Sequence, residues 1–250
     1  MNRKDLRKNV LVTGATGGIG SAVARKFYDG GFNVALHYAH SREKAELLAE
    51  TLSENDGGVV RVFGADFTDP YSVGDMFREI REDLGEIDIL VNNAGKGNFG
   101  LVADLTYEEW RTVFAVNVDA AFLCTREVLP YMIRQRYGKI VNVSSIWGIT
   151  GASCEADYSA AKAALIGFTK ALAKEVGPSG INVNCVAPGI IDTEMNSRLS
   201  PEEMMELIDE TPLMRIGLPR EVAETVFFLC GEGASFITGQ VISPNGGFVI

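Results

Sequence analysis

A tyrosine and a lysine four residues apart, Tyr158 and Lys162, form the spacing in this chain that points most directly to chemistry. On a helix, residues i and i+4 share a face, so the phenol and the ammonium would project into the same space. Two unit charges about 4 Å apart attract by roughly 4 kcal/mol at an effective dielectric of about 20, so the lysine would lower the phenol pKa from about 10 toward about 7. Such a phenol is suited to general acid catalysis near neutral pH. An isolated pair of this kind is more often a chance pair on a surface, so the interpretation depends on a cofactor site elsewhere in the chain.

A glycine-rich segment, Thr13–Gly20, lies between the first predicted strand and the first predicted helix. Glycines permit a tight turn and a close approach of the backbone to a pyrophosphate, which binds at the positive end of the helix. The spacing is GxxxGxG rather than GxGxxG, and a glycine-rich turn alone can be structural. Its place between strand and helix favours a dinucleotide site. The expected contacts in this turn are Gly14, Thr16, Gly18, Ile19 and Gly20.

The second predicted strand ends in Leu36-His-Tyr38, without the acidic residue that binds the ribose 2′-hydroxyl of NAD. A carboxylate there would repel a 2′-phosphate, so its absence, with Ser41 and Arg42 just beyond, favours NADP(H) over NAD(H). The alternative is that Arg42 only solvates the start of a helix. Asp66 would either accept a hydrogen bond from the adenine amino group or, like Asp69, cap the next helix. Tyr38 and Phe67 complete the expected contacts at this end of the cofactor.

Short apolar runs alternate with longer amphipathic stretches along the chain. Strands are predicted at Val10–Thr13, Asn33–Tyr38, Val59–Gly64, Ile87–Val91, Lys139–Val143, Ile181–Ala187 and Gln240–Ser243, and helices at about 18–30, 41–55, 70–84, 107–136, 157–176 and 219–230. Continuous apolar runs are typical of parallel strands covered on both faces. The alternation therefore predicts an α/β Rossmann fold: a seven-stranded, doubly wound parallel sheet with helices on both faces. No linker, repeat or low-complexity tract interrupts residues 1–250, so one domain is expected.

The composition disfavours several classes of protein. No apolar run approaches the roughly 20 residues of a membrane span, and the net charge of −10 disfavours binding to nucleic acid. The basic segment Met1–Lys8 lacks the apolar stretch of a secretory signal and is expected to be a solvated tail. Four scattered cysteines indicate reduced thiols in a cytoplasm, and no metal site is predicted. Two predicted helices, 112–133 and 159–176, are apolar around most of their circumference, which indicates either a deep core or contacts between subunits.

The motifs, taken in order, identify the chain as a member of the short-chain dehydrogenase/reductase family over essentially its whole length. They are Thr13–Gly20, Asp66, Asn92–Gly95, Asn117, Ser145, Tyr158 with Lys162, and Pro188-Gly189. The resemblance implies that Tyr158 protonates a carbonyl oxygen as hydride arrives from the nicotinamide, while Lys162 lowers its pKa and binds the nicotinamide ribose. It also implies that Ser145 orients the substrate carbonyl and that Asn117 anchors a water relay. Ser144 would point the other way at the strand end. Further cofactor contacts implied by the resemblance are Asn93, Ala94, Gly95, Pro188, Gly189, Ile191 and Thr193.

Within the family, three segments resemble bacterial 3-oxoacyl-acyl-carrier-protein reductases. They are Ile166–Lys170, Val186–Ile191 and Ile237–Gly247. This implies an acyl carrier protein as partner and a homotetramer packed through the two apolar helices and the C-terminal strand. Of the two arginines that such enzymes present to the acidic carrier, Arg136 fits one, but Ser179 occupies the place of the other, and Gly17 replaces an arginine that often contacts the 2′-phosphate. A non-catalytic NADP-binding regulator is the remote alternative. The complete set of Asn117, Ser145, Tyr158 and Lys162 argues against it, because a binding protein needs no proton donor.

Glu155 stands three residues before Tyr158, where these reductases usually have a neutral glutamine. A carboxylate beside a substrate pocket favours a cationic group, and Trp147 would offer an aromatic face to the same charge. The surrounding residues also resemble reductases of the 5-aminopentanone carried on a lysine of elongation factor P. Alternatively, Glu155 points to solvent or caps the helix that begins near Asp157. An acyl-carrier ketone and an amine-bearing ketone both remain open.

Residues 192–217 contain four of the seven methionines, Met195, Met204, Met205 and Met214. In this family the segment covers the substrate, and flexible thioethers adapt to varied shapes. Methionines that fill gaps in a core would produce the same composition. The segment is therefore expected to form a lid, but its composition names no ligand.

Overall fold

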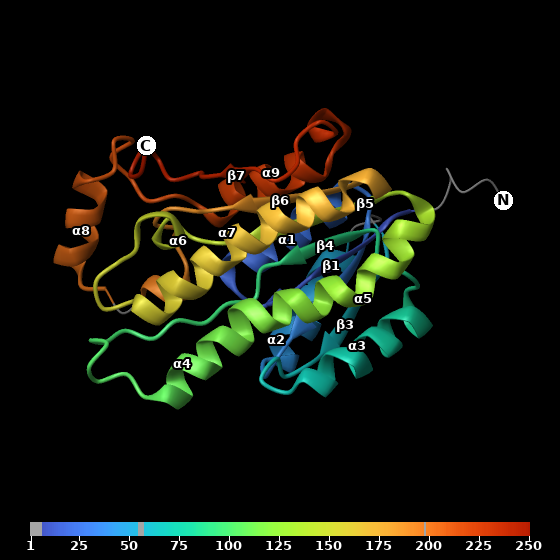
Figure 1. Ribbon diagram of the computed structural model, residues 1–250, viewed down its shortest axis with the longest axis horizontal. Helices are drawn as coiled ribbons and strands as arrows, with labels where there is room; N and C mark the ends of the chain where they lie inside the picture. Colours follow the sequence, from blue (N-terminus) through green and yellow to red (C-terminus); the bar gives the residue numbers. More distant parts are fainter. Residues whose placement is uncertain (1–6, 55–57, 198) are drawn as a thin grey trace.

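A single parallel sheet organises the computed structural model, which describes residues 7–54, 58–197 and 199–250 (Figure 1). Within these residues the sheet has seven strands in the order β3-β2-β1-β4-β5-β6-β7. Their bounds are β1 (Asn9–Val12), β2 (Asn33–Tyr38), β3 (Val60–Gly64), β4 (Ile89–Asn92), β5 (Gly138–Val143), β6 (Ile181–Val186) and β7 (Val241–Ile242). The strand order reverses between β1 and β4, which is the point where α/β sheets of this type bind ligands. Most of the expected N-terminal tail, residues 1–6, lies outside the described residues.

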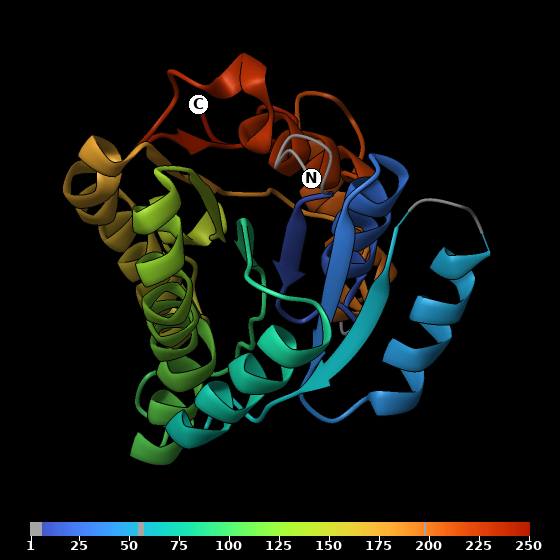
Figure 2. The same ribbon diagram turned by 90° about the vertical axis from the view of Figure 1, so that its right-hand side faces the viewer.

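Helices cover both faces of the sheet, as Figure 2 shows from the end of the molecule. Buried side chains of α1 (Gly18–Asp29), α2 (Arg42–Ser53) and α9 (Pro219–Cys230) pack with one face of the sheet. Those of α3 (Pro70–Asp83), α5 (Ala120–Gln135) and α7 (Ala156–Val176) pack with the other. The predicted doubly wound Rossmann fold is confirmed. Strands β1, β4 and β5 are buried throughout because both faces of the sheet are covered there, whereas the edge strands β3 and β7 are partly exposed.

The predicted helix 107–136 is wrong in one respect, because a π-helical turn interrupts it. The segment consists of α4 (Tyr107–Phe114), the turn η2 (Ala115–Asp119) and α5. Such turns insert a residue into a helix, and they often mark functional positions. Two helices were not predicted: α6 (Trp147–Thr150), which follows β5, and α8 (Pro201–Asp209), which lies within the expected lid. Among the described residues, no helix is long and apolar enough to span a membrane.

Candidate active site

Helix α7 carries Tyr158 and Lys162 on one face, and both side chains are buried. The Lys162 ammonium lies 5.4 Å from the centroid of the Tyr158 ring. Its Nζ donates a hydrogen bond to the carbonyl oxygen of Val143 at the end of β5 (2.9 Å). Burial lowers the pKa of Lys162 to about 8, which the neighbouring Cys185 partly opposes. The lysine is thus held by the sheet, close to the phenol, in a state that titrates near neutral pH.

The π-helical turn brings Asn117 to the same place. Its Nδ2 donates to the carbonyl oxygens of Lys96 (2.7 Å) and Val113 (2.8 Å). Its Oδ1 is buried and has no hydrogen-bond partner among the described residues. A Cβ atom added to Gly95 would lie 2.9 Å from this oxygen and 3.0 Å from the Lys162 ammonium. The unsatisfied acceptor therefore lies next to the lysine across Gly95, in a position that suits a bound water.

The two serines that follow β5 have different partners. The Ser144 hydroxyl donates to the carbonyl oxygen of Lys162 (2.8 Å), whereas Ser145 Oγ accepts the backbone N–H of Trp147 (3.2 Å). Gly148 in α6 lies against the same backbone, because a Cβ atom there would be 2.7 Å from the carbonyl carbon of Lys162. Ser144 thus connects β5 to α7. Ser145, Tyr158, Trp147 and Glu155 line one pocket.

The glycine turn lies between β1 and α1 and contacts the other predicted cofactor segments closely. Gly14 has a φ of +62°, and a Cβ atom on it would be 2.9 Å from Ala94 Cα. A Cβ on Gly18 would lie 2.8 Å from the Thr193 side chain, and one on Gly20 would lie 2.2 Å from the Gly14 carbonyl oxygen. These contacts leave no space for side chains at the three glycines. The turn also contains Thr16 and Ile19, and Ile19 lines the pocket with Tyr158.

Asn93 and Ala94, after β4, are tied to the glycine turn by hydrogen bonds. Their backbone N–H groups donate to Thr13 Oγ1 (2.9 and 3.0 Å). The Asn93 amide donates to the carbonyl oxygens of Thr13 and Gly14 (2.9 and 3.1 Å). Gly17, which precedes α1, makes no side-chain cap at this helix N-terminus. The turn, the open helix terminus and the absence of side chains fit the pyrophosphate of a dinucleotide.

The segment after β6 closes the other side of the pocket. Pro188, Gly189, Ile191 and Thr193 line it together with Ser145. The Pro188 carbonyl accepts the N–H of Ile146 (3.0 Å), and Gly189 N–H donates to Pro244 (3.1 Å). The predicted residues of the nicotinamide end therefore line one pocket with Ser145 and Tyr158, two of the predicted catalytic residues.

At the far end of the cleft, the structure decides between several alternatives. Asp69 caps α3 by accepting the N–H of Tyr71 (3.0 Å). Asp66 instead accepts the Thr68 N–H and hydroxyl (2.9 and 2.7 Å), and these bonds lower its pKa. Helix capping therefore belongs to Asp69, and Asp66 lies exposed at the end of β3 beside the buried Phe67.

The residues beyond β2 are accessible at the surface. Tyr38 ends β2, and Ser41 is the N-cap residue of α2 without a side-chain cap. Arg42 is exposed and pairs with Glu46 (2.8 Å). A cation at this position is available to a ligand, since an exposed ion pair contributes little to stability.

Glu155 stands at the N-cap position of α7, but its side chain makes no capping hydrogen bond. It is half-buried and faces the pocket that Trp147 also lines. The capping alternative for Glu155 is therefore wrong. Trp147 packs edge-to-face against Phe248, with ring centroids 5.8 Å apart.

Sequence reasoning missed two residues that position the start of α7. The buried Asp157 accepts the N–H of Tyr158 through Oδ1 (2.7 Å) and the amide of Asn98 through Oδ2 (2.9 Å). Asn98 lines the pocket, and Gly97 beside it packs against the Tyr158 ring. A carboxylate in the first turn of a helix was a signal in the sequence, but its partner lies 59 residues away.

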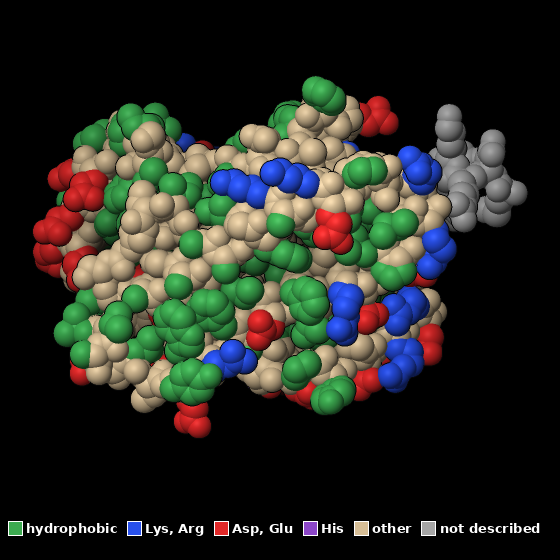
Figure 3. Space-filling view, in the orientation of Figure 1, with side chains coloured by type: hydrophobic (Ala, Val, Ile, Leu, Met, Phe, Trp, Pro, Cys, Tyr) green, Lys and Arg blue, Asp and Glu red, His purple; other side chains and the backbone are tan. Residues whose placement is uncertain are grey.

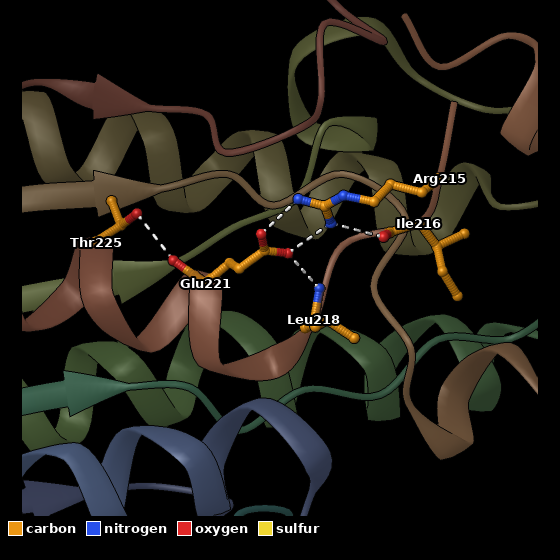
Figure 4. A network of polar contacts seen from close by, with 5 residues as sticks. All are labelled: Arg215, Ile216, Leu218, Glu221 and Thr225. Atoms are coloured by element: carbon orange, nitrogen blue, oxygen red, sulfur yellow. Dashed lines mark hydrogen bonds and ion pairs between the residues drawn. The ribbon is translucent and has the colours of Figure 1, made fainter. Parts of the chain in front are cut away.

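Of the segment 192–217, Thr193, Met195 and Asn196 line the pocket. Met195, Met205 and Met214 are at least half exposed, so these methionines do not fill a core. The end of the segment is attached to α9, because Arg215 makes two hydrogen bonds to Glu221 (2.9 and 2.6 Å; Figure 4). Glu221 also accepts the N–H of Leu218 (2.8 Å), and the Arg215 guanidinium lowers the pKa of Glu221 to about 2.

A Rossmann sheet with a glycine turn at its switch point, opening toward a buried tyrosine and lysine, defines a nicotinamide-dependent oxidoreductase. Comparison with known proteins agrees. A family model described as enoyl-(acyl carrier protein) reductase matches residues 14–249, and the chain belongs to the short-chain dehydrogenase/reductase family. It is 42% identical to an uncharacterized oxidoreductase of Bacillus subtilis, covering 97% of this chain and 99% of that protein. It is 44% identical to the 3-oxoacyl-[acyl-carrier-protein] reductase of Aquifex aeolicus (95% of both chains) and 40% identical to that of Staphylococcus aureus (97% and 98%).

Proposed function

We propose that this enzyme is an NADPH-dependent reductase of ketones, with Asn117, Ser145, Tyr158 and Lys162 as its catalytic residues. The observation that carries the proposal is the pocket in which Ser145 and Tyr158 meet Ile19 of the glycine turn. A ketone in this pocket would contact the phenol and the serine beside the site of the cofactor.

The nicotinamide, when bound, supplies the hydride. Tyr158 donates its hydroxyl proton to the carbonyl oxygen, and Ser145 orients that oxygen by a hydrogen bond. The buried Lys162 ammonium stabilises the phenolate that remains and binds the nicotinamide ribose. A water on the unsatisfied Asn117 Oδ1 would return a proton toward Lys162. The burial of Ser145, Tyr158 and Lys162 shields this charge separation from solvent.

The preference for NADPH rests on the end of β2. Tyr38 occupies the place of an acidic residue, and Arg42 offers an exposed cation next to Ser41. We expect kcat/KM to be higher with NADPH than with NADH, and Arg42→Ala to reduce this ratio. Arg78→Ala is the matched control, because Arg78 is similarly exposed on α3. A higher kcat/KM with NADH in the parent enzyme would overturn the preference.

For the substrate, we propose a 3-oxoacyl group on an acyl carrier protein. The names of the two reductases that share 44% and 40% identity with this chain support it. Arg136 is exposed at the end of α5 and would contact the acidic carrier. The lid over residues 192–217, which has exposed methionines, suits an apolar acyl chain.

The second candidate is a reductase of the 5-aminopentanone group on elongation factor P. Its support is Glu155, which faces the pocket beside Trp147 without capping α7. NADPH oxidation with an acetoacetyl thioester, a neutral ketone and an amino-ketone, including modified elongation factor P, separates the two candidates. Glu155→Gln should reduce kcat/KM for the cationic ketone alone. An equal loss on the acetoacetyl thioester would eliminate the second candidate.

We also propose that the chain is one domain that forms a cytoplasmic homotetramer. Figure 3 shows hydrophobic side chains gathered over α4 and α5, and Phe122 and Ile133 of α5 are nearly half exposed. Exposed hydrophobic side chains gathered on one face favour subunit contacts. The thiols of Cys124, Cys154, Cys185 and Cys230 are free, which suits a reducing compartment. Phe122→Ser should lower the mass measured by light scattering, whereas Tyr71→Ser, on the exposed face of α3, should not.

A further inference from the structure

His37 is a buried histidine in β2 that lies directly against the glycine turn. Its Nδ1 accepts the backbone N–H of Gly14 (3.0 Å), and its Nε2 lies 3.0 Å from the carbonyl oxygen of Ala65. An amide N–H only donates and a carbonyl only accepts, so the ring is neutral with its proton on Nε2. Burial lowers the pKa of His37 to about 4, which keeps this form at neutral pH.

The same residue joins three segments of the cofactor cleft. Its backbone carbonyl accepts the N–H of Ala15 in the glycine turn (2.9 Å). Its ring stacks on Phe67, which follows β3, at a centroid distance of 4.1 Å and an interplanar angle of 12°. The His37 side chain therefore contacts both the glycine turn, which is expected to bind the pyrophosphate, and Phe67, which is expected to lie at the adenine end of the cofactor.

The contact with Gly14 bears on the shape of the turn. Gly14 has a positive φ, and its N–H is directed inward to the imidazole rather than outward to a ligand. Without an acceptor at this position, a partly buried N–H would be left unsatisfied, and the turn would relax to find another partner. The turn that is expected to bind the pyrophosphate is thus held by His37, whose own side chain is buried.

We propose that His37 is a positioning residue for the adenosine and pyrophosphate half of the cofactor, acting on NADPH and NADH alike. The inference rests on the proposed use of a nicotinamide cofactor. It separates His37 from Arg42, whose proposed role concerns the 2′-phosphate alone. The alternative role for His37 is a core histidine that contributes only to stability.

Two substitutions each keep one of the two hydrogen bonds of the His37 ring and remove the other. The amide oxygen of asparagine is attached to Cγ, as Nδ1 is, so His37→Asn can keep the acceptor for Gly14. The amide nitrogen of glutamine occupies the position of Nε2, so His37→Gln can keep the donor to Ala65 but not the bond to Gly14. His37→Leu removes both.

The test is the dissociation constant of each variant for NADPH and for NADH, measured by fluorescence titration well below each melting temperature. His37→Asn should stay within about threefold of the parent, and His37→Gln should bind both nucleotides about five- to tenfold more weakly, as expected for loss of one buried hydrogen bond. His37→Leu should be at least as weak, and kcat at saturating NADPH should change less than about twofold in all three, since the reacting groups are distant from the change. Arg42→Ala is the control that should weaken NADPH alone.

Parental affinities in both His37→Gln and His37→Leu would overturn the inference, as would a loss confined to NADPH. If the leucine variant does not fold, the comparison of asparagine with glutamine decides the question, because both keep a polar side chain. A parent protein that binds neither nucleotide would contradict the proposed function itself, an outcome distinct from either of these.

Discussion

The hydroxyl of Ser144 donates a 2.8 Å hydrogen bond to the backbone carbonyl of Lys162, so strand β5 is attached to helix α7 one turn beyond Tyr158. Lys162 makes a second bond between the same two elements, because its ammonium donates to the carbonyl oxygen of Val143 at the end of β5. The two bonds set the position of α7 relative to Ser145. The catalytic arrangement that we propose thus depends on a serine that does not itself reach the substrate.

Removal of this attachment should impair catalysis more than it impairs stability. We expect Ser144→Ala to lower the free energy of unfolding by about 1 kcal/mol, the usual contribution of one hydrogen bond, and to lower kcat by about tenfold as the near-attack geometry loosens. Denaturant titration and steady-state kinetics measure the two effects. Ser53→Ala is the matched control, since its hydroxyl also donates to a backbone carbonyl (2.8 Å) but on α2. An unchanged kcat in Ser144→Ala would assign Ser144 a structural role only.

Tyr158→Phe should abolish turnover while leaving the cofactor bound. The substitution removes only the hydroxyl that we propose as proton donor, and general acid catalysis contributes roughly 10²–10⁴-fold. NADPH oxidation should therefore fall by about that factor, and the NADPH dissociation constant should change little. The exposed Tyr107 on α4 supplies the control variant Tyr107→Phe. Turnover retained in Tyr158→Phe would mean that the proton comes from another group.

The rate of ketone reduction should decline above about pH 8. The charged Lys162 is the form that we propose to be active, and burial lowers its pKa to about 8 from 10.5. The kcat/KM value reports groups of the free enzyme, so its profile should fall with a midpoint near that pH. A profile that stays flat to pH 10 would contradict this role for Lys162.

The same lysine affects stability with a defined sign. The unfolded chain binds the proton more tightly than the folded one, so burial of the ammonium destabilises the fold at pH values below about 8. This cost diminishes as the pH rises from about 8 toward 10.5. Lys162→Met should therefore flatten the alkaline part of the curve of unfolding free energy against pH.

Glu221→Gln should affect substrate binding more than stability. Both Arg215 and Glu221 are more than one third exposed, so loss of the pair should cost less than about 1 kcal/mol. Because Arg215 ends the expected lid, we expect KM for the ketone to rise about threefold, which corresponds to about 0.65 kcal/mol. Glu224→Gln is the matched control, since Glu224 stands on the same helix but pairs with Lys26 of α1. Equal KM values in the two variants would show that the Arg215–Glu221 pair does not affect substrate binding through the lid.

Much of the fold followed from local patterns. The alternation of apolar runs and amphipathic stretches predicted the strands and the long helices, because each is defined by its own periodicity. The same patterns failed at α6, which has only four residues and is too short to carry a clear period. They also missed α8, although Ser200 and Glu203 form a capping box that marks its start in the sequence. They also failed at the π-helical turn, because the apolar spacing through Asn117 is compatible with one continuous helix.

The sequence by itself determined the chemistry that the chain can offer: a glycine turn after a strand, a tyrosine and a lysine one helical turn apart, and a carboxylate at position 155. These are short-range relationships, so residue type and spacing are sufficient to recognise them. Only the tertiary structure decided which groups meet, namely Asp157 with Asn98, Ser144 with the Lys162 backbone, and His37 with Gly14. The physical reason is that these bonds join the ends of different strands and helices, where the packing of the sheet, rather than any local preference, selects the partner.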